Sequence, residues 1–198
     1  GAEVVLVDED FAGVTQRYID FAEDTGALAI HPFDAPNTLA GQGTVALEME
    51  QQLAGLDTLL VSVGGGGLIG GIAAWFGDRI RIIAVETEQT ASYAAARVSG
   101  FGTQIVPAGI SASALGGTSI GALGWQALSQ ANVTSVVVSD QDVIKAGEQL
   151  WSGARLVGEP GAATAMAALT SGGYAPEKDE NVAVLICGGN ADPNWFMA

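Results

Sequence analysis

The sequence predicts an α/β protein whose mostly parallel sheet is covered by helices on both faces. Short runs of β-branched and apolar residues alternate with segments of helical length along the 198 residues. The central apolar runs carry almost no charge, which is typical of strands buried on both faces. A run of four glycines follows one of these strands and precedes a helical segment. This order of strand, turn and helix favours a parallel α/β architecture.

The first 38 residues contain two short apolar runs separated by one helical segment. We expect strands at residues 4–7 and 27–31 and a helix at residues 11–24. Two strands and one helix are too little to enclose a core, so residues 1–38 are expected to be a remnant of a small domain. The prolines at positions 32 and 36 mark a break in the chain. Residues 39–198 are expected to form the C-terminal part of a larger domain.

From residue 39 onward, the pattern predicts a regular alternation of helices and strands. Asp140 is the predicted N-cap of a long helix. A composition rich in Gly, Ser and Ala predicts a loop at residues 101–118. The expected helices cover residues 40–53, 68–76, 91–98, 120–129, 140–156 and 159–169, and the expected strands cover residues 58–63, 80–86, 135–139 and 182–187.

The composition excludes several classes of function. Seven basic residues oppose 22 acidic ones, and the net charge of −15 argues against nucleic acid and anionic membranes as partners. One cysteine and one histidine exclude a disulfide framework and a His/Cys zinc cluster. No basic segment followed by an apolar core opens the chain, so we expect a cytoplasmic protein. Residues 58–77 are uncharged, but seven of these 20 residues are glycine, which favours a buried strand and helix over a membrane span.

The glycine run is formed by Gly64, Gly65, Gly66 and Gly67. Consecutive glycines destabilise helices and strands, so this place must require backbone without side chains. Ligands of open α/β sheets bind beyond the carboxyl ends of the strands, where free N–H groups and the helix dipole favour an anion. No Gly-Lys-Ser/Thr follows, so this is not a Walker A loop, and the match to Gly-x-Gly-x-x-Gly is weak. A phosphate site is favoured over the alternative, a tight packing turn.

Five segments occur together in a fixed order. They are His31-Pro-Phe-Asp34, Ala40-Gly-Gln-Gly-Thr44, the glycine run with Leu68, Glu159-Pro-Gly-Ala162 and Cys187-Gly-Gly-Asn190. This combination resembles the serine/threonine dehydratase branch of the fold type II enzymes that use pyridoxal 5'-phosphate (PLP), a branch that includes serine racemase and has the tryptophan synthase β-like fold. The resemblance implies β-elimination from L-threonine or L-serine, giving a 2-oxo acid and ammonia. Racemisation of the same amino acids remains open, and a homo-oligomer is expected.

The resemblance also implies roles for single residues. The glycine run and the amide of Leu68 match the loop that holds the phosphate of PLP. Cys187 matches the residue that faces the pyridine nitrogen, where a thiol donates only a weak hydrogen bond. An inert small core residue is the alternative for Cys187. Glu159 matches a glutamate that orders the cofactor pocket, and a helix N-cap carboxylate is a compatible alternative.

Glu86 matches a position that ligates a cation in relatives. Ser92 stands where relatives with divalent sites carry an acidic residue, so the resemblance favours a monovalent cation. A solvated Glu86 is an equal alternative. His31 is expected to be structural, because the acid–base group of the family is a lysine.

Two departures from the family pattern stand out. The segment Ser111-Ala-Ser-Ala-Leu-Gly116 lacks an acidic residue that relatives carry at the position of Ala114. The Schiff-base lysine is also absent, because Lys145 and Lys178 are the only lysines and neither lies in a Ser-x-Lys segment. We therefore expect the C-terminal portion of a longer enzyme, inactive alone and without a catalytic residue of its own. The alternative is a non-catalytic fragment that binds PLP or phosphate.

Overall fold

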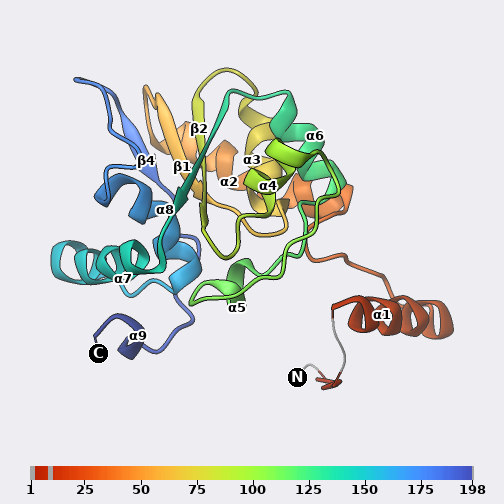
Figure 1. Cartoon of the computed structure of the whole chain (residues 1–198). Helices are drawn as coiled ribbons and strands as arrows, with labels where there is room; N and C mark the ends of the chain where they lie inside the picture. Colours follow the sequence, from red (N-terminus) through yellow and green to blue (C-terminus); the bar gives the residue numbers. More distant parts are fainter. Residues whose placement is uncertain (1–2, 9–10, 198) are drawn as a thin grey trace. The chain divides into compact units, whose positions relative to one another are not determined.

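The structure is a computed structural model that describes residues 3–8 and 11–197 (Figure 1). The chain divides after His31 into two compact units, residues 1–31 and 32–198. The assignment of residues 1–38 to a small-domain remnant and of residues 39–198 to a larger domain stays a prediction.

The first unit contains the helix α1 (Phe11–Thr25), as the sequence predicts. The expected strands at residues 4–7 and 27–31 are wrong, because both segments are irregular. The side chains of Leu6 and Leu28 are 91% and 85% exposed. A strand needs a neighbour for its backbone groups and its apolar face, and the described residues of this unit supply no second strand.

The second unit is built on a sheet of four parallel strands in the order β3-β2-β1-β4. The strands are β1 (Thr58–Ser62), β2 (Arg81–Thr87), β3 (Val133–Val138) and β4 (Val182–Val184). In the centre of the sheet, Leu60 lies opposite Ile83 on one side and Val184 on the other. Every residue of β1 is buried, which explains its uniformly uncharged composition.

Both faces of the sheet are covered by helices, as predicted (Figure 1). Leu59 and Val61 point into the core on one face, and Leu60 points into the core on the other, because successive side chains of a strand alternate. The first face is covered by α2 (Pro36–Gln52), α3 (Gly67–Phe76), α4 (Ser92–Ser99) and α6 (Ala122–Ser129), and the second face by α7 (Asp140–Gln149) and α8 (Pro160–Thr170).

The helices α2 and α3 pack closely through glycine. A Cβ atom on Gly71 of α3 would meet the carbonyl oxygen of Leu39 and lie 2.7 Å from the backbone nitrogen of Gly43. The segment Ala40-Gly-Gln-Gly-Thr44 therefore serves helix packing, since Gly43 lies at the crossing. It also positions α3, whose first turn follows the glycine run.

Several element boundaries differ from the prediction. The helix α2 begins at Pro36 rather than at residue 40, because proline is well suited to the first turn of a helix. The N-cap of α7 is Ser139 rather than Asp140. The Ser139 hydroxyl accepts a hydrogen bond from the Asp142 amide (3.2 Å), and the Asp142 carboxylate accepts one from the Ser139 amide (3.2 Å), which forms a capping box.

The second unit also departs from the expected pattern at several places after α4. After α7 the chain continues as a π-helical turn, η1 (Leu150–Ala154), and does not remain α-helical to residue 156. The strand β4 ends at Val184, three residues before the predicted end. Two short helices were not expected: α5 (Ala112–Leu115), inside the predicted loop at residues 101–118, and α9 (Asn194–Met197).

Candidate functional site

The glycine run connects the carboxyl end of β1 to the first turn of α3. Gly66 has φ of 90°, a left-handed conformation that favours glycine, and its carbonyl accepts the Gly70 amide at 2.9 Å. The backbone N–H groups of residues 64–68 donate no hydrogen bond to any part of the chain that the structure describes. A row of free amides at the positive end of a helix dipole is an arrangement that binds anions.

Each glycine of the run is also packed against another segment. A Cβ atom on Gly65 would lie 2.5 Å from the Cγ of Phe33, and one on Gly67 would lie 2.8 Å from the Phe33 Cα. A Cβ on Gly64 would lie 3.1 Å from the Leu115 Cα, and one on Gly66 would meet the end of the Ile120 side chain. Packing and anion binding are therefore both compatible with the glycine run. The packing of Ile120 has no signal in the sequence.

The loop that carries Phe33 is held by its neighbour Asp34. The Asp34 carboxylate accepts hydrogen bonds from the amides of Ala122 (3.0 Å) and Leu123 (2.9 Å) at the start of α6. The Gly121 amide in turn donates to the carbonyl of Gly65 at 3.0 Å. Phe33 therefore lies over the glycine run on a loop that is anchored to α6. His31 belongs to the first unit.

The segment that lacks the expected acidic residue lies between the glycine run and the start of α8. A Cβ on Gly161 would lie 2.7 Å from the Cβ of Ala114. The buried hydroxyls of Ser111 and Thr164 lie 3.2 Å apart. Residues 111–117 therefore join the glycine run to the Glu159-Pro-Gly turn, although these segments are far apart in sequence.

The structure brings Glu159 and Cys187 together. The Glu159 amide donates to the carbonyl of Gly188 (3.0 Å), and a Cβ on Gly188 would lie 2.7 Å from the Glu159 Cδ. Cys187 is exposed at the surface, but the surrounding protein partly desolvates its thiol. This desolvation raises the pKa of the Cys187 thiol, and the charge of Glu159 adds to the rise. Glu159 occupies the N-cap position of α8, yet its side chain makes no capping hydrogen bond.

Cys187 follows the strand next to the glycine run. The Leu185 amide donates to the Leu60 carbonyl at 3.0 Å, which continues the pairing of β4 with β1 by one residue. The segments that follow β1 and β4 therefore reach the same edge of the sheet, because parallel strands point the same way. The roles of the glycine run and of Cys187 as cofactor contacts stay predictions.

Glu86 is fully buried, so the alternative of a solvated carboxylate is wrong. Its two oxygens accept hydrogen bonds from the amides of Tyr93 (2.7 Å) and Ala94 (2.8 Å) in the first turn of α4. The hydroxyl of Ser92 donates to the carbonyl of Gly64 at 3.2 Å, which joins α4 to the glycine run. The described residues contain no group of three or more His, Cys, Asp or Glu side chains that could hold a metal ion. The monovalent cation stays a prediction.

Burial raises the pKa of Glu86 from its usual 4.5 to about 7, against the opposing effect of its backbone hydrogen bonds. Because the folded state retains this proton more strongly than the unfolded state, the contribution of Glu86 to stability is fully present below pH 4.5 and is lost as the pH rises through 7. We expect this residue to lower the free energy of unfolding by up to about 3 kcal/mol over that interval.

The measurement is urea denaturation at several pH values, with tetramethylammonium as the only buffer cation so that no small ion reaches the carboxylate. Glu86→Gln has no proton to lose and is expected to show a flatter profile between pH 4.5 and 7. An equal slope in both proteins would contradict the assignment.

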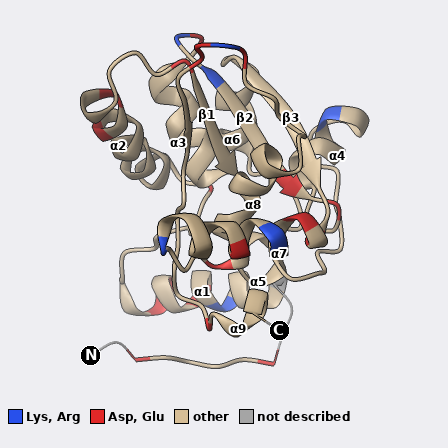
Figure 2. Cartoon of the chain, turned by 90° about the vertical axis from the view of Figure 1, so that its left-hand side faces the viewer, with Lys and Arg blue, Asp and Glu red and all other residues tan. Residues whose placement is uncertain are grey.

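Neither lysine lies at the glycine run. Lys145 is exposed on α7. Lys178 lines a cavity of about 380 Å³ at the opposite edge of the sheet, together with Thr58 and Arg81, which begin β1 and β2. Figure 2 shows charged residues of both signs gathered in the loops at this edge.

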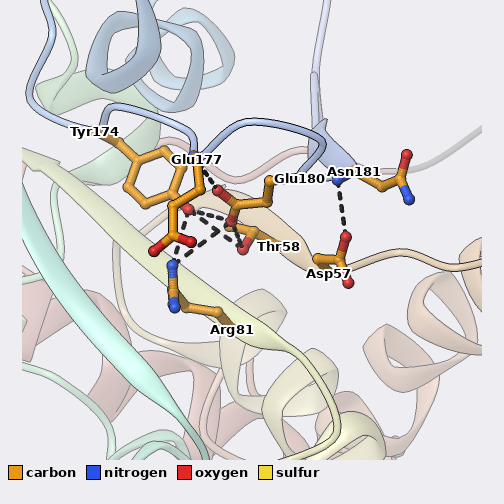
Figure 3. Close-up of polar contacts among 7 residues, drawn as sticks. All are labelled: Asp57, Thr58, Arg81, Tyr174, Glu177, Glu180 and Asn181. Atoms are coloured by element: carbon orange, nitrogen blue, oxygen red, sulfur yellow. Dashed lines mark hydrogen bonds and ion pairs between the residues drawn. The ribbon is translucent and has the colours of Figure 1, made fainter.

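The polar side chains at that opposite edge form hydrogen bonds and an ion pair with one another. The Glu180 carboxylate accepts hydrogen bonds from the hydroxyls of Thr58 and Tyr174, and Arg81 lies 3.6 Å from it (Figure 3). The Asn181 amide donates to the Asp57 carboxylate at 2.9 Å. These contacts tie the start of β4 to the start of β1, so the cluster is structural.

Within the residues that the structure describes, no helix is long and apolar enough to cross a membrane. This agrees with the reading of residues 58–77 as β1, the glycine run and α3.

Known proteins resemble this chain both in sequence and in fold. The chain is 34% identical to the biosynthetic L-threonine dehydratase of Haemophilus influenzae, covering 96% of this chain and 38% of that protein. It is 30% identical to the L-threonine ammonia-lyase of Thermotoga maritima, covering 99% of this chain and 49% of that protein. The chain thus spans less than half the length of these two relatives.

Solved structures show the same fold. The processed form of threonine deaminase isoform 2 from Solanum lycopersicum superposes with a TM-score of 0.85 at 26% identity, over 96% of this chain and 56% of that one. Maize serine racemase gives a TM-score of 0.79 at 29% identity, over 94% and 59%. A family model described as "Pyridoxal-phosphate dependent enzyme" matches residues 1–188. The chain therefore belongs to the family of pyridoxal-phosphate-dependent enzymes.

Proposed function

We propose that this chain provides the phosphate- and ring-binding part of an enzyme that converts L-threonine or L-serine to a 2-oxo acid and ammonia. The observation that carries the proposal is the row of free amides at residues 64–68, at the carboxyl end of the buried strand β1. The similarity to threonine dehydratases supports the substrate class.

The residues of this chain fit two parts of PLP, its phosphate group and its ring nitrogen. Bound PLP supplies an electron sink for the negative charge that develops when the α-proton of the amino acid is removed. The amides of residues 64–68 and the start of α3 would hold its phosphate. The raised pKa of Cys187 favours the protonated thiol, which would offer the ring nitrogen a weak hydrogen bond without fixing a positive charge there. This weak contact suits β-elimination better than transamination.

The net reaction conserves the atoms of the amino acid. The β-hydroxyl leaves as water, and hydrolysis of the resulting enamine returns that water and releases ammonia with the 2-oxo acid. The base that removes the α-proton is not supplied by Lys145 or Lys178, since both are exposed away from the glycine run. The chain's own contribution is binding and orientation.

The proposal is tested first by titrating the chain with PLP, followed by absorbance, and by competition with inorganic phosphate. We expect saturable binding that phosphate weakens. Absence of binding would overturn the proposal. The reaction is tested with the full-length protein by measuring 2-oxo acid formation from L-threonine and L-serine. Chiral analysis of the remaining serine distinguishes elimination from racemisation, which the serine racemase relatives keep as an alternative.

A second candidate function is binding of PLP or phosphate without chemistry. The placement of both lysines away from the glycine run favours this function for the 198 residues. Borohydride reduction in the presence of PLP, followed by mass spectrometry, tests it. A specific adduct on Lys145 or Lys178 would contradict it. A homo-oligomer and a monovalent cation at Glu86 remain part of the proposal for the enzyme.

A further inference from the structure

The short helix α9 fixes a tryptophan against the second face of the sheet unit. Phe196 is buried, and its ring meets that of Trp195 edge to face, with centroids 5.1 Å apart. The Trp195 indole packs on Gly147 of α7 so closely that a Cβ there would lie 2.6 Å from its Cη2. The indole therefore has a defined orientation.

The indole N–H of Trp195 donates to the carbonyl of Gly158 at 3.0 Å. The next residue, Glu159, donates its own amide to the carbonyl of Gly188 at 3.0 Å. These two hydrogen bonds hold the turn formed by Gly158 and Glu159 from two different segments. The Glu159 carboxyl group then lies against Gly188, beside Cys187.

Trp195 and Glu159 also share a cavity. Its volume is about 360 Å³, and its lining includes Ser113, Glu159, Asn190 and Trp195. Ser113 belongs to the segment that contacts the glycine run, so the cavity adjoins the other parts of the candidate site.

We propose that Trp195 is a positioning residue, whose indole N–H fixes the turn at Gly158 and so holds the Glu159 carboxylate beside Cys187. The proposal deepens the proposed function and rests on it for the identity of the cofactor. A role in packing alone is the competing explanation, and Trp195→Phe separates the two because it keeps a ring and removes the N–H donor.

Cys187 provides a readout that needs no cofactor, because it is the chain's single cysteine. Among charged side chains, Glu159 is the one that raises its pKa, so moving or neutralising this carboxylate lowers the thiol pKa. At a fixed pH below the thiol pKa, we expect iodoacetamide to label Glu159→Gln and Trp195→Phe about twofold faster than the wild type. The double variant is expected to react no faster than Glu159→Gln alone.

Trp151→Phe is the matched control, because Trp151 is partly exposed and stacks on Arg155, with the guanidinium carbon 5.5 Å from the ring centroid. It is expected to react at the wild-type rate. A wild-type rate in Trp195→Phe or in Glu159→Gln would overturn the proposal, as would additive effects in the double variant. Should Trp195→Phe fail to fold, hydrogen exchange of the wild-type Trp195 indole N–H decides: protection supports the proposal, and rapid exchange overturns it.

A second titration, with PLP, separates this proposal from the proposed function. We expect Trp195→Phe to weaken PLP binding about fivefold and Trp151→Phe to leave it unchanged. If the wild type does not bind PLP, the proposed function fails, while the labelling of Cys187 still decides the role of Trp195. If the wild type binds and Trp195→Phe binds equally well, the positioning role is overturned and the proposed function stands.

Discussion

Replacement of Gly65 by alanine is expected to lower the affinity for PLP by more than about 100-fold. The new Cβ would lie 2.5 Å from Cγ and 2.6 Å from Cδ1 of the Phe33 ring. Phe33 cannot retreat easily, because its loop is anchored to α6 through Asp34. The glycine run must therefore shift, and loss of two hydrogen bonds to the charged phosphate, at about 1.5 kcal/mol each, would reduce the affinity about 100-fold. Titration followed by absorbance measures the loss.

The double variant Phe33→Ala/Gly65→Ala tests whether contact with the Phe33 ring causes this loss of affinity. Because Phe33→Ala removes the ring that the new Cβ would meet, we expect the double variant to bind PLP more tightly than Gly65→Ala. Phe33→Ala alone serves as the reference for the lost ring. Wild-type affinity in Gly65→Ala would show that the run tolerates a side chain. A double variant that binds no better than Gly65→Ala would show that Phe33 is not the obstacle.

Replacement of Gly71 by alanine is expected to lower the free energy of unfolding by about 3 kcal/mol, the upper end of the usual range for overpacking. The new Cβ would meet the Leu39 carbonyl oxygen and lie 2.7 Å from the Gly43 nitrogen. Both are backbone atoms, so α2 as a whole must move away from α3 rather than one side chain. Urea denaturation measures the change in free energy.

Gly41→Ala is the matched control on α2, the helix that Gly71 packs against, because a Cβ on Gly41 meets nothing within 4 Å. It is expected to raise stability by up to about 1 kcal/mol, since alanine favours helices over glycine. If Gly71→Ala costs no more than an exposed helical substitution, the close crossing of α2 and α3 is wrong.

Prediction from the sequence is most accurate where composition alone decides whether a segment forms a strand, a helix or a turn. The strands β1 and β2 were predicted to within one residue because strands buried on both faces carry long runs of apolar residues. The helix α3 was predicted because the glycine run marks the residue at which it begins. The glycine run was placed at the correct edge of the sheet, since a parallel strand followed by a helix leaves its turn at the carboxyl end.

The prediction fails where a segment depends on its neighbours. Residues 4–7 have the composition of a strand, but a strand forms only with a partner. Ser139 and Asp140 are both good N-cap residues, and the choice between them depends on which backbone reaches Asp142. Glu86 has an acidic side chain that composition favours at the surface, yet it is buried because α4 offers two amides to it.

The sequence by itself determined the fold class and the family resemblance, because these depend on composition and on motifs of a few residues, and the same motifs supplied the predicted residues of the candidate site. Only the tertiary structure decided how that site is held together. Phe33 lies on the glycine run, Ala114 on Gly161, and Trp195 on the carbonyl before Glu159. Each of these contacts joins segments more than 30 residues apart. Such contacts arise when the apolar faces of different elements are buried together, and a local pattern carries no record of its distant partner.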